Sequence, residues 1–145
     1  MKRINHFFLT LALLLLTAFS ATAQDLTGKW WDEEHKGQTE LYLSPNGKLY
    51  GKITMLSEAI DKETGKPALD KHNSDKKLRS RPTMGLVVVI GFVKNGDKWE
   101  GTVYNPKDGK TYSGYMQLQA DGTLKLRGYV GISLIGKTEI WTRVK

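Results

Sequence analysis

Short stretches in which apolar and polar residues alternate recur along this chain. In residues 123–130, for example, Leu124, Leu126 and Val130 share one face, and Lys125 and Arg127 share the other. Alternation with a period of two residues predicts β-strands that bury one face. Eight such segments, separated by Gly, Asn and Asp, start near Gly28, Gln38, Lys48, Gly85, Lys98, Lys110, Thr123 and Lys137.

The connections between these segments alternate between short and long. Residues 44–47, 95–97 and 120–122 are short and contain the Asn-Gly or Asp-Gly residues that tight hairpins need. The other connections are longer, and the third runs over residues 56–84. In an up-and-down meander, alternate turns lie at opposite ends. The chain is therefore predicted to be all-β: an eight-stranded antiparallel up-and-down barrel with one compact end and one elaborated mouth.

Five predicted strands carry a glycine on their apolar face, namely Gly51, Gly91, Gly101, Gly114 and Gly128. Glycine inside a strand weakens pairing, so a recurring set needs a reason. One reason is the curvature that closes a small barrel. The other is an interior cavity left by the missing side chains. The sequence leaves both open.

The long third connection is expected to be anchored at both ends and loose in the middle. Residues 61–75 contain almost no apolar side chain. The following strand, residues 86–93, is apolar on both faces, and residues 78–82 are expected to cover its outer face.

The first residues have the form of a secretory signal peptide. A basic start, an apolar run over residues 7–19 and the small residues Ala21 and Ala23 precede Gln24. We expect residues 1–23 to be removed and residues 24–145 to form a single domain, exported to the periplasm or secreted, without a stable membrane span. An uncleaved anchor is the alternative interpretation.

Charge and cysteine content narrow the function classes. The net charge of +7 falls to +5 without Lys2 and Arg3, which favours anionic surfaces but does not indicate nucleic acid. The chain has no cysteine, so the fold rests on its hydrophobic core. Oligomeric state cannot be read from these features.

The two ends of the predicted barrel resemble lipocalins. Gly28-Lys29-Trp30 opens the first strand and Trp141-Thr142-Arg143 closes the last. In lipocalins a Gly-x-Trp packs beside an Arg of the last strand, so the resemblance implies a barrel floor formed by Trp30 and Arg143. The alternative is two ordinary core tryptophans and a surface arginine.

Motifs along nearly the whole domain resemble a bacterial family of exported domains of unknown function with a lipocalin-like barrel. They are the Gly-Lys-Trp-Trp at 28–31, Leu-Arg-Ser-Arg-Pro at 78–82, residues 104–112, Leu-Arg-Gly-Tyr-Val-Gly at 126–131 and Trp-Thr-Arg at 141–143. The resemblance implies the fold and no reaction. The long loop follows the third strand rather than the first, so ligand residues of ordinary lipocalins cannot be carried over.

No catalytic motif is present, and we do not expect an enzyme. There is no Gly-x-Ser-x-Gly and no phosphate-binding glycine loop. The polar run Asp32-Glu33-Glu34-His35 is interpreted as a solvated turn, because its spacing matches no metal site. No metal or cofactor is expected.

Two functions from different classes fit these patterns. The first is binding of a small, partly apolar or amphipathic molecule in the barrel, with Arg79 or Arg81 meeting an acidic group. The expected apolar contacts are Leu49, Ile53, Val103, Tyr112, Met116, Leu126 and Val130. The second is a cell-envelope structural or protein-interaction module without a ligand, whose contact surface includes Tyr50, Tyr104, Tyr115 and Tyr129 on the outer face.

Overall fold

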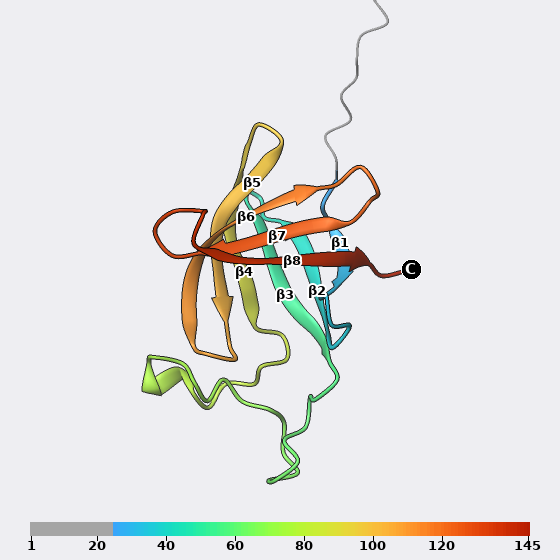
Figure 1. Cartoon of the computed structure of the whole chain (residues 1–145). Helices are drawn as coiled ribbons and strands as arrows, with labels where there is room; N and C mark the ends of the chain where they lie inside the picture. Colours follow the sequence, from blue (N-terminus) through green and yellow to red (C-terminus); the bar gives the residue numbers. More distant parts are fainter. Residues whose placement is uncertain (1–24) are drawn as a thin grey trace, which may run out of the picture.

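The computed structural model describes residues 25–145, and the predicted signal peptide lies outside these described residues. Eight antiparallel strands form a sheet that closes on itself (Figure 1). They are β1 (Gly28–Trp31), β2 (Gly37–Leu43), β3 (Leu49–Leu56), β4 (Val87–Asn95), β5 (Lys98–Asn105), β6 (Lys110–Leu118), β7 (Leu124–Tyr129) and β8 (Gly136–Arg143). Each strand pairs with the next, and β8 returns to β1. The predicted barrel is confirmed, and every strand begins within two residues of its predicted start.

The two ends of the barrel differ, as the turn lengths predict. The turns after β2, β4 and β6 place Gly47, Gly96 and Gly122 at φ of 78°, 63° and 83°, a region that glycine enters without strain. We call this the compact end. The loops after β1, β3, β5 and β7 surround the opposite end, the mouth, which faces the bottom and left of Figure 1.

The core fills the barrel from the compact end. Its largest fully buried side chains are Trp30, Leu41, Leu49, Val89, Phe92, Met116 and Leu124. Glycines allow these side chains to approach the sheet: a Cβ on Gly101 would lie 2.5 Å from the Phe92 ring, and one on Gly51 would lie 2.7 Å from Leu41. Gly91 has another role, because its φ of 64° coincides with a register shift between β4 and β5.

Trp30 and Arg143 meet at the compact end. The guanidinium carbon of Arg143 lies 4.2 Å from the centroid of the Trp30 ring. The same guanidinium donates hydrogen bonds to the carbonyls of Thr27 (2.8 Å) and Asp25 (2.9 Å), while the Trp30 indole donates to the Leu26 carbonyl (2.9 Å). The segment before β1 is thereby tied across the floor of the barrel.

The long loop between β3 and β4 is more structured than its sequence predicts. It folds back on itself through the bridges Ile60↔Pro67 and Leu69↔Pro82 and contains the short 3-10 helix η2 (Lys76–Leu78). Asp70, in the stretch expected to be loose, is completely buried. The expectation of a loose middle is therefore wrong: one polar side chain anchors a segment that lacks apolar ones.

The outer face of β4 is not covered as expected. Val87, Ile90 and Val93 remain 37%, 37% and 53% exposed. The loop instead lies below the barrel at the mouth (Figure 1).

Candidate functional site

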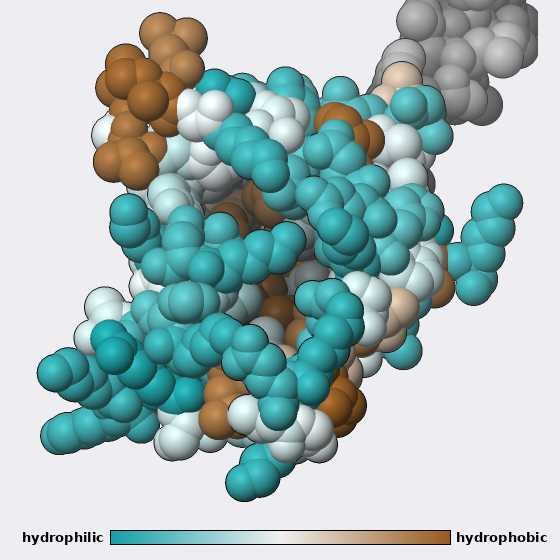
Figure 2. Space-filling view, turned by 60° about the horizontal axis from the view of Figure 1, so that its bottom comes forward, coloured by the Kyte–Doolittle hydropathy of each residue, from teal (hydrophilic) through white to brown (hydrophobic). Residues whose placement is uncertain are grey.

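A cavity of about 540 Å³ opens at the mouth of the barrel. Looking into the mouth, Figure 2 shows a hollow with hydrophobic residues at its base and hydrophilic residues around its opening. Pockets of roughly 300–1,000 Å³ hold most small ligands. The cavity is therefore large enough for one.

The base of the cavity is aliphatic and aromatic. It is formed by Ile53, Leu56, Val88, Val89, Val103, Leu126 and Trp141. These residues come from β3, β4, β5, β7 and β8, where period-two alternation turns apolar side chains inward. An apolar body would lose its contact with water here.

The apolar residues and the tyrosine expected to contact a ligand fall into two groups, and the two arginines form a third group described below. Ile53, Val103, Tyr112, Leu126 and Val130 line the cavity. Leu49 and Met116 are 1% and 0% exposed and belong to the packed core rather than to the cavity lining.

Arg79 and Arg81 lie outside the cavity lining because the long loop uses them internally. Arg79 Nε donates to the Asn73 carbonyl at 2.7 Å. Arg81 contacts Asp70 through Nε and Nη2, each 2.9 Å from the same carboxylate oxygen. Only Arg81 contacts an anion, and that anion is the Asp70 carboxylate of the chain itself rather than a ligand.

The buried Asp70 carboxylate organises this side of the mouth. It accepts hydrogen bonds from the Tyr104 hydroxyl (2.5 Å) and the Asn73 amide (2.8 Å) in addition to Arg81. Burial acts to raise the pKa of Asp70, but these three donors outweigh it and leave the pKa below its usual value. Tyr104, expected on the outer face, is 7% exposed as a result of this network.

Gly128 leaves open space on the inner face of β7. A Cβ placed on it meets nothing closer than the Tyr112 Cβ at 3.9 Å, and Gly128 lines the cavity. At Gly114, in contrast, a Cβ would lie 2.9 Å from Val103. Close packing, curvature and an open cavity are thus each served by particular glycines.

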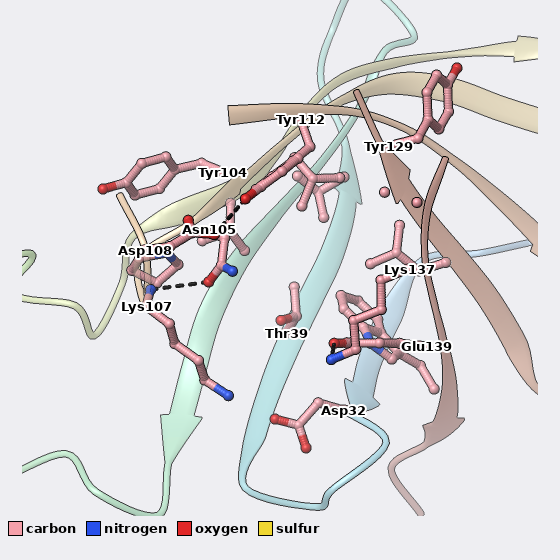
Figure 3. Close-up of a pocket in the computed structure, with 18 of the residues that line it drawn as sticks. Asp32, Thr39, Tyr104, Asn105, Lys107, Asp108, Tyr112, Tyr129, Lys137 and Glu139 are labelled. Atoms are coloured by element: carbon pink, nitrogen blue, oxygen red, sulfur yellow. Dashed lines mark hydrogen bonds and ion pairs between the residues drawn. The ribbon is translucent and has the colours of Figure 1, made fainter. Parts of the chain in front are cut away.

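Charged groups lie at the opening (Figure 3). Lys137 Nζ is 3.2 Å from Glu139 Oε1, and the other oxygen of Glu139 accepts from the Trp141 indole at 3.2 Å. Lys107, on the loop after β5, also lines the cavity. Among residues 25–145 no ion pair involves Lys107.

Tyr112 and Asp108 form a hydrogen-bonded pair at the rim. The Tyr112 hydroxyl donates to Asp108 at 2.5 Å. Burial acts to raise the pKa of Asp108, but Tyr112 and the Lys110 amide hold it below its usual value, while Asp108 raises the pKa of Tyr112. Near neutral pH the pair is a carboxylate and a phenol, and neither is tuned to exchange protons.

Several lining residues escaped the sequence interpretation, chiefly Lys107, Lys137 and Glu139. Lys137 and Glu139 precede Trp141 at a spacing of two, which places all three on one face of β8. That alternation could have revealed them. Lys107 lies in a turn-forming sequence, where no periodicity indicates which way a side chain points.

The polar run after β1 forms a turn. Asp32 accepts from the Lys36 amide at 2.8 Å, Glu34 pairs with Lys36 at 2.7 Å, and the His35 ring stacks on Trp31. Within the part of the chain that the structure describes, no three His, Cys, Asp or Glu side chains are grouped to hold a metal ion.

The structure resembles a protein described as "Protein HP1028 from the human pathogen Helicobacter pylori belongs to the lipocalin family". That chain is 27% identical, the similarity covers 83% of this chain and 84% of the other, and the TM-score is 0.69. No match was found among curated protein sequences.

A family model also matches residues 28–143, the span from the first strand of the barrel to the last. The family is described as "Uncharacterized protein conserved in bacteria (DUF2147)". The chain therefore belongs to this bacterial family of uncharacterised proteins and has the lipocalin-like barrel that its sequence predicts.

Proposed function

We propose that this is an exported binding protein that takes a small, partly apolar molecule with an acidic group into the barrel through its mouth. The observation that supports it is the cavity, which has an aliphatic base and a polar rim. A closed eight-stranded barrel is wide enough inside to hold one small ligand. Export is supported by the form of residues 1–23 and is tested by locating the protein in cell fractions.

In this proposal the acidic group of the ligand binds to the ammonium of Lys107. An apolar body between Val89, Val103 and Leu126 would leave its polar end at the rim. Of the two lysines there, Lys137 is paired with Glu139, whereas Lys107 is not paired within residues 25–145. Asp32 and Asp108 also line the opening, and their carboxylates repel an anion. Lys107 therefore favours an anionic ligand only through direct contact with its acidic group.

The first experiment looks for a natural ligand. The protein is purified without detergent, denatured, and its organic extract is examined by mass spectrometry. A recurring small molecule with an apolar body and an acidic group, present in stoichiometric amount, supports the proposal. The Gly128→Leu variant, purified in the same way, should lack it.

Gly128→Leu is a sharp test because the backbone there has no positive φ and a Cβ would meet nothing closer than 3.9 Å, so the added side chain projects into the cavity. We expect it to abolish binding of the neutral fluorescent probe N-phenyl-1-naphthylamine while the fold is retained. Lys125→Leu, on the other face of β7, is the matched control and should bind as the parent does. Equal binding by all three proteins would place the probe outside the cavity and contradict the proposal.

The charge assignment is tested with a probe of the same aromatic frame that carries a sulfonate, 8-anilinonaphthalene-1-sulfonate. Lys107→Gln should weaken binding of the sulfonate by at least about tenfold and leave the neutral probe unaffected, since one charge-assisted contact contributes about 1.5–3 kcal/mol. Lys110→Gln, which lies on β6 outside the cavity lining, is the charge-matched control. If neither probe binds and no extract contains a ligand, the result would favour the alternative function, a structural or protein-interaction module without a ligand.

A further inference from the structure

The loop between β7 and β8 is the most exposed apolar segment of the described structure. Val130, Ile132, Leu134 and Ile135 are 67%, 59%, 85% and 68% exposed, and residues 130–135 contain no charge. We call residues 130–135 the apolar tip. It projects at the left of Figure 1, and a hydrophobic projection occupies the same side of Figure 2.

Four carbonyl groups of this tip, those of residues 132–135, are already hydrogen-bonded within the protein. Ile132 O accepts from the Ile135 amide at 3.1 Å, and Ile135 O accepts from the Val130 amide at 3.4 Å. Arg127 donates to the two carbonyls between them, those of Ser133 and Leu134. Four consecutive acceptors therefore do not need water.

From these two observations together we infer that the apolar tip docks onto a phospholipid bilayer, with Ile132 and Leu134 entering its outer acyl region. Lipid esters and phosphates accept hydrogen bonds but few lipid groups donate them, so backbone carbonyls entering this region need partners from the protein. Aliphatic insertion of this kind scales with the apolar area buried. At the base of the tip Arg127, whose partners are neutral oxygens, brings a positive charge to where anionic headgroups would lie, while the charge of Lys137 is balanced by Glu139.

A lipid surface fits the tip better than a protein does. Protein hot spots are enriched in Trp, Tyr and Arg, and the tip contributes only aliphatic side chains, glycine and serine. A stable protein interface buries about 800 Å² on each partner, more than a six-residue projection supplies. In residues 25–145 no helix is long and apolar enough to cross a membrane.

The docked position brings the cavity to the membrane. Val130 and Ile135 belong to the tip and also line the cavity. A molecule with an apolar body could then pass between acyl chains and barrel without crossing water. This transfer rests on the proposed function, whereas docking itself does not.

The experiment uses the absence of cysteine from the chain. The barrel is complete within residues 25–145, so protein without residues 1–23 is labelled at Leu134→Cys with an environment-sensitive fluorophore. The control is Leu43→Cys, which is 51% exposed at the compact end. With vesicles of phosphatidylcholine and phosphatidylglycerol in equal parts, we expect the emission of the fluorophore to shift to the blue and to rise several-fold in intensity at position 134 alone.

A second variant measures affinity. Replacing both Ile132 and Leu134 by serine should reduce co-flotation with these vesicles at least about tenfold, whereas Leu43→Ser should float as the parent does. No response at position 134, or an equal response at position 43, would overturn the inference. So would a response that grows with protein concentration in the absence of vesicles, because a second copy would then be the partner. The double variant should bind N-phenyl-1-naphthylamine in solution like the parent, which separates failure of docking from failure of ligand binding.

Discussion

At the scale of single residues, the contact of Arg143 with Trp30 combines a stacked guanidinium with two hydrogen bonds to the chain before β1. The indole is completely buried, while Arg143 is exposed on its outer side. Exposure screens the attraction, so the stacking itself contributes modestly. The hydrogen bonds to Thr27 and Asp25 hold the arginine in place over the ring.

A double-mutant cycle of Trp30→Ala and Arg143→Ala should therefore show a coupling of about 0.5–1 kcal/mol in the free energy of unfolding. Urea unfolding of the parent, both single variants and the double variant gives the number. Trp30→Phe serves as a second replacement if alanine abolishes folding, since it keeps an aromatic ring in the core. Strictly additive effects would show that the stacking adds nothing to stability.

Asp70 gives stability a dependence on acid pH. Its pKa in the folded protein lies below its ordinary value of 3.8, so its contribution is fully present above that value and is lost as pH falls toward the folded pKa. Asp70→Asn should lower the free energy of unfolding by about 1–3 kcal/mol at pH 7, because Arg81 loses its charged partner. The difference from the parent should shrink below pH 4.

The control for Asp70 is Asp121→Asn, an exposed aspartate in the turn after β6. It should change the free energy of unfolding much less at pH 7. A loss at Asp70→Asn that is equal at pH 7 and pH 3 would show that the buried network, and not the charge, carries the effect.

At the scale of elements, the long loop has an exposed hairpin and a pinned section. Residues 62–66 form the exposed hairpin, closed by the Asp61 and Lys66 backbones. The section that contains Asp70 and Asn73 packs against the loop after β5, where a Cβ on Gly109 would overlap the His72 carbonyl. The two sections should therefore differ in stability.

Brief trypsin treatment should cut after Lys62, Lys76 or Lys77 before it cuts after Lys71, because Lys71 lies in the pinned section between Asp70 and His72. Removing residues 62–65 should change stability little, since loop closure depends weakly on length. Gly109→Ala should instead loosen the pinned section and expose Lys71. Early cleavage after Lys71 in the parent protein would contradict this division.

The sequence predicted the strands and turns because both depend on local patterns. Gly47, Gly96 and Gly122 mark turns by their own conformational freedom, and alternation in β6 and β7 is visible without any partner. The fold of the long loop was not predictable in this way. Asp70 meets Tyr104 across 34 positions, and no local pattern encodes that hydrogen bond.

The candidate site was predictable in part for the same reason. Inward positions such as Val103 and Leu126 follow from alternation, but how deeply the core fills the barrel does not. Leu49 and Met116 have the same pattern as Val103 and Leu126 and lie below the cavity lining in the packed core. The position of Lys107 at the cavity could be recognised only from the folded loop after β5.

At the scale of the whole molecule, the barrel closes over a short seam. The register between β1 and β8 contains two residue pairs, Trp30 with Arg143 and Trp31 with Thr142, whereas β5 and β6 pair over seven positions. A closed sheet is expected to open first between the two strands that are paired over the fewest residues. The seam should therefore be the weakest joint of the closed sheet.

Amide hydrogen exchange should show this order. The amides of Trp31 and Val144 should exchange faster than those of Thr102 and Val103 in β5, and Arg143→Ala should widen the difference. Protection of β1 equal to that of β5 would indicate that the sheet opens as one unit.

Both ends of the described chain emerge at the floor, opposite the mouth. Arg143 reaches back to Asp25, and the Val144 amide donates to the Lys29 carbonyl at 2.9 Å. A tether attached at either terminus would consequently orient every molecule with its opening outward. A protein immobilised by its C-terminal residue on a sensor chip or bead would be held at the end opposite the mouth loops (Figure 1), so the cavity and the apolar tip would face the solution.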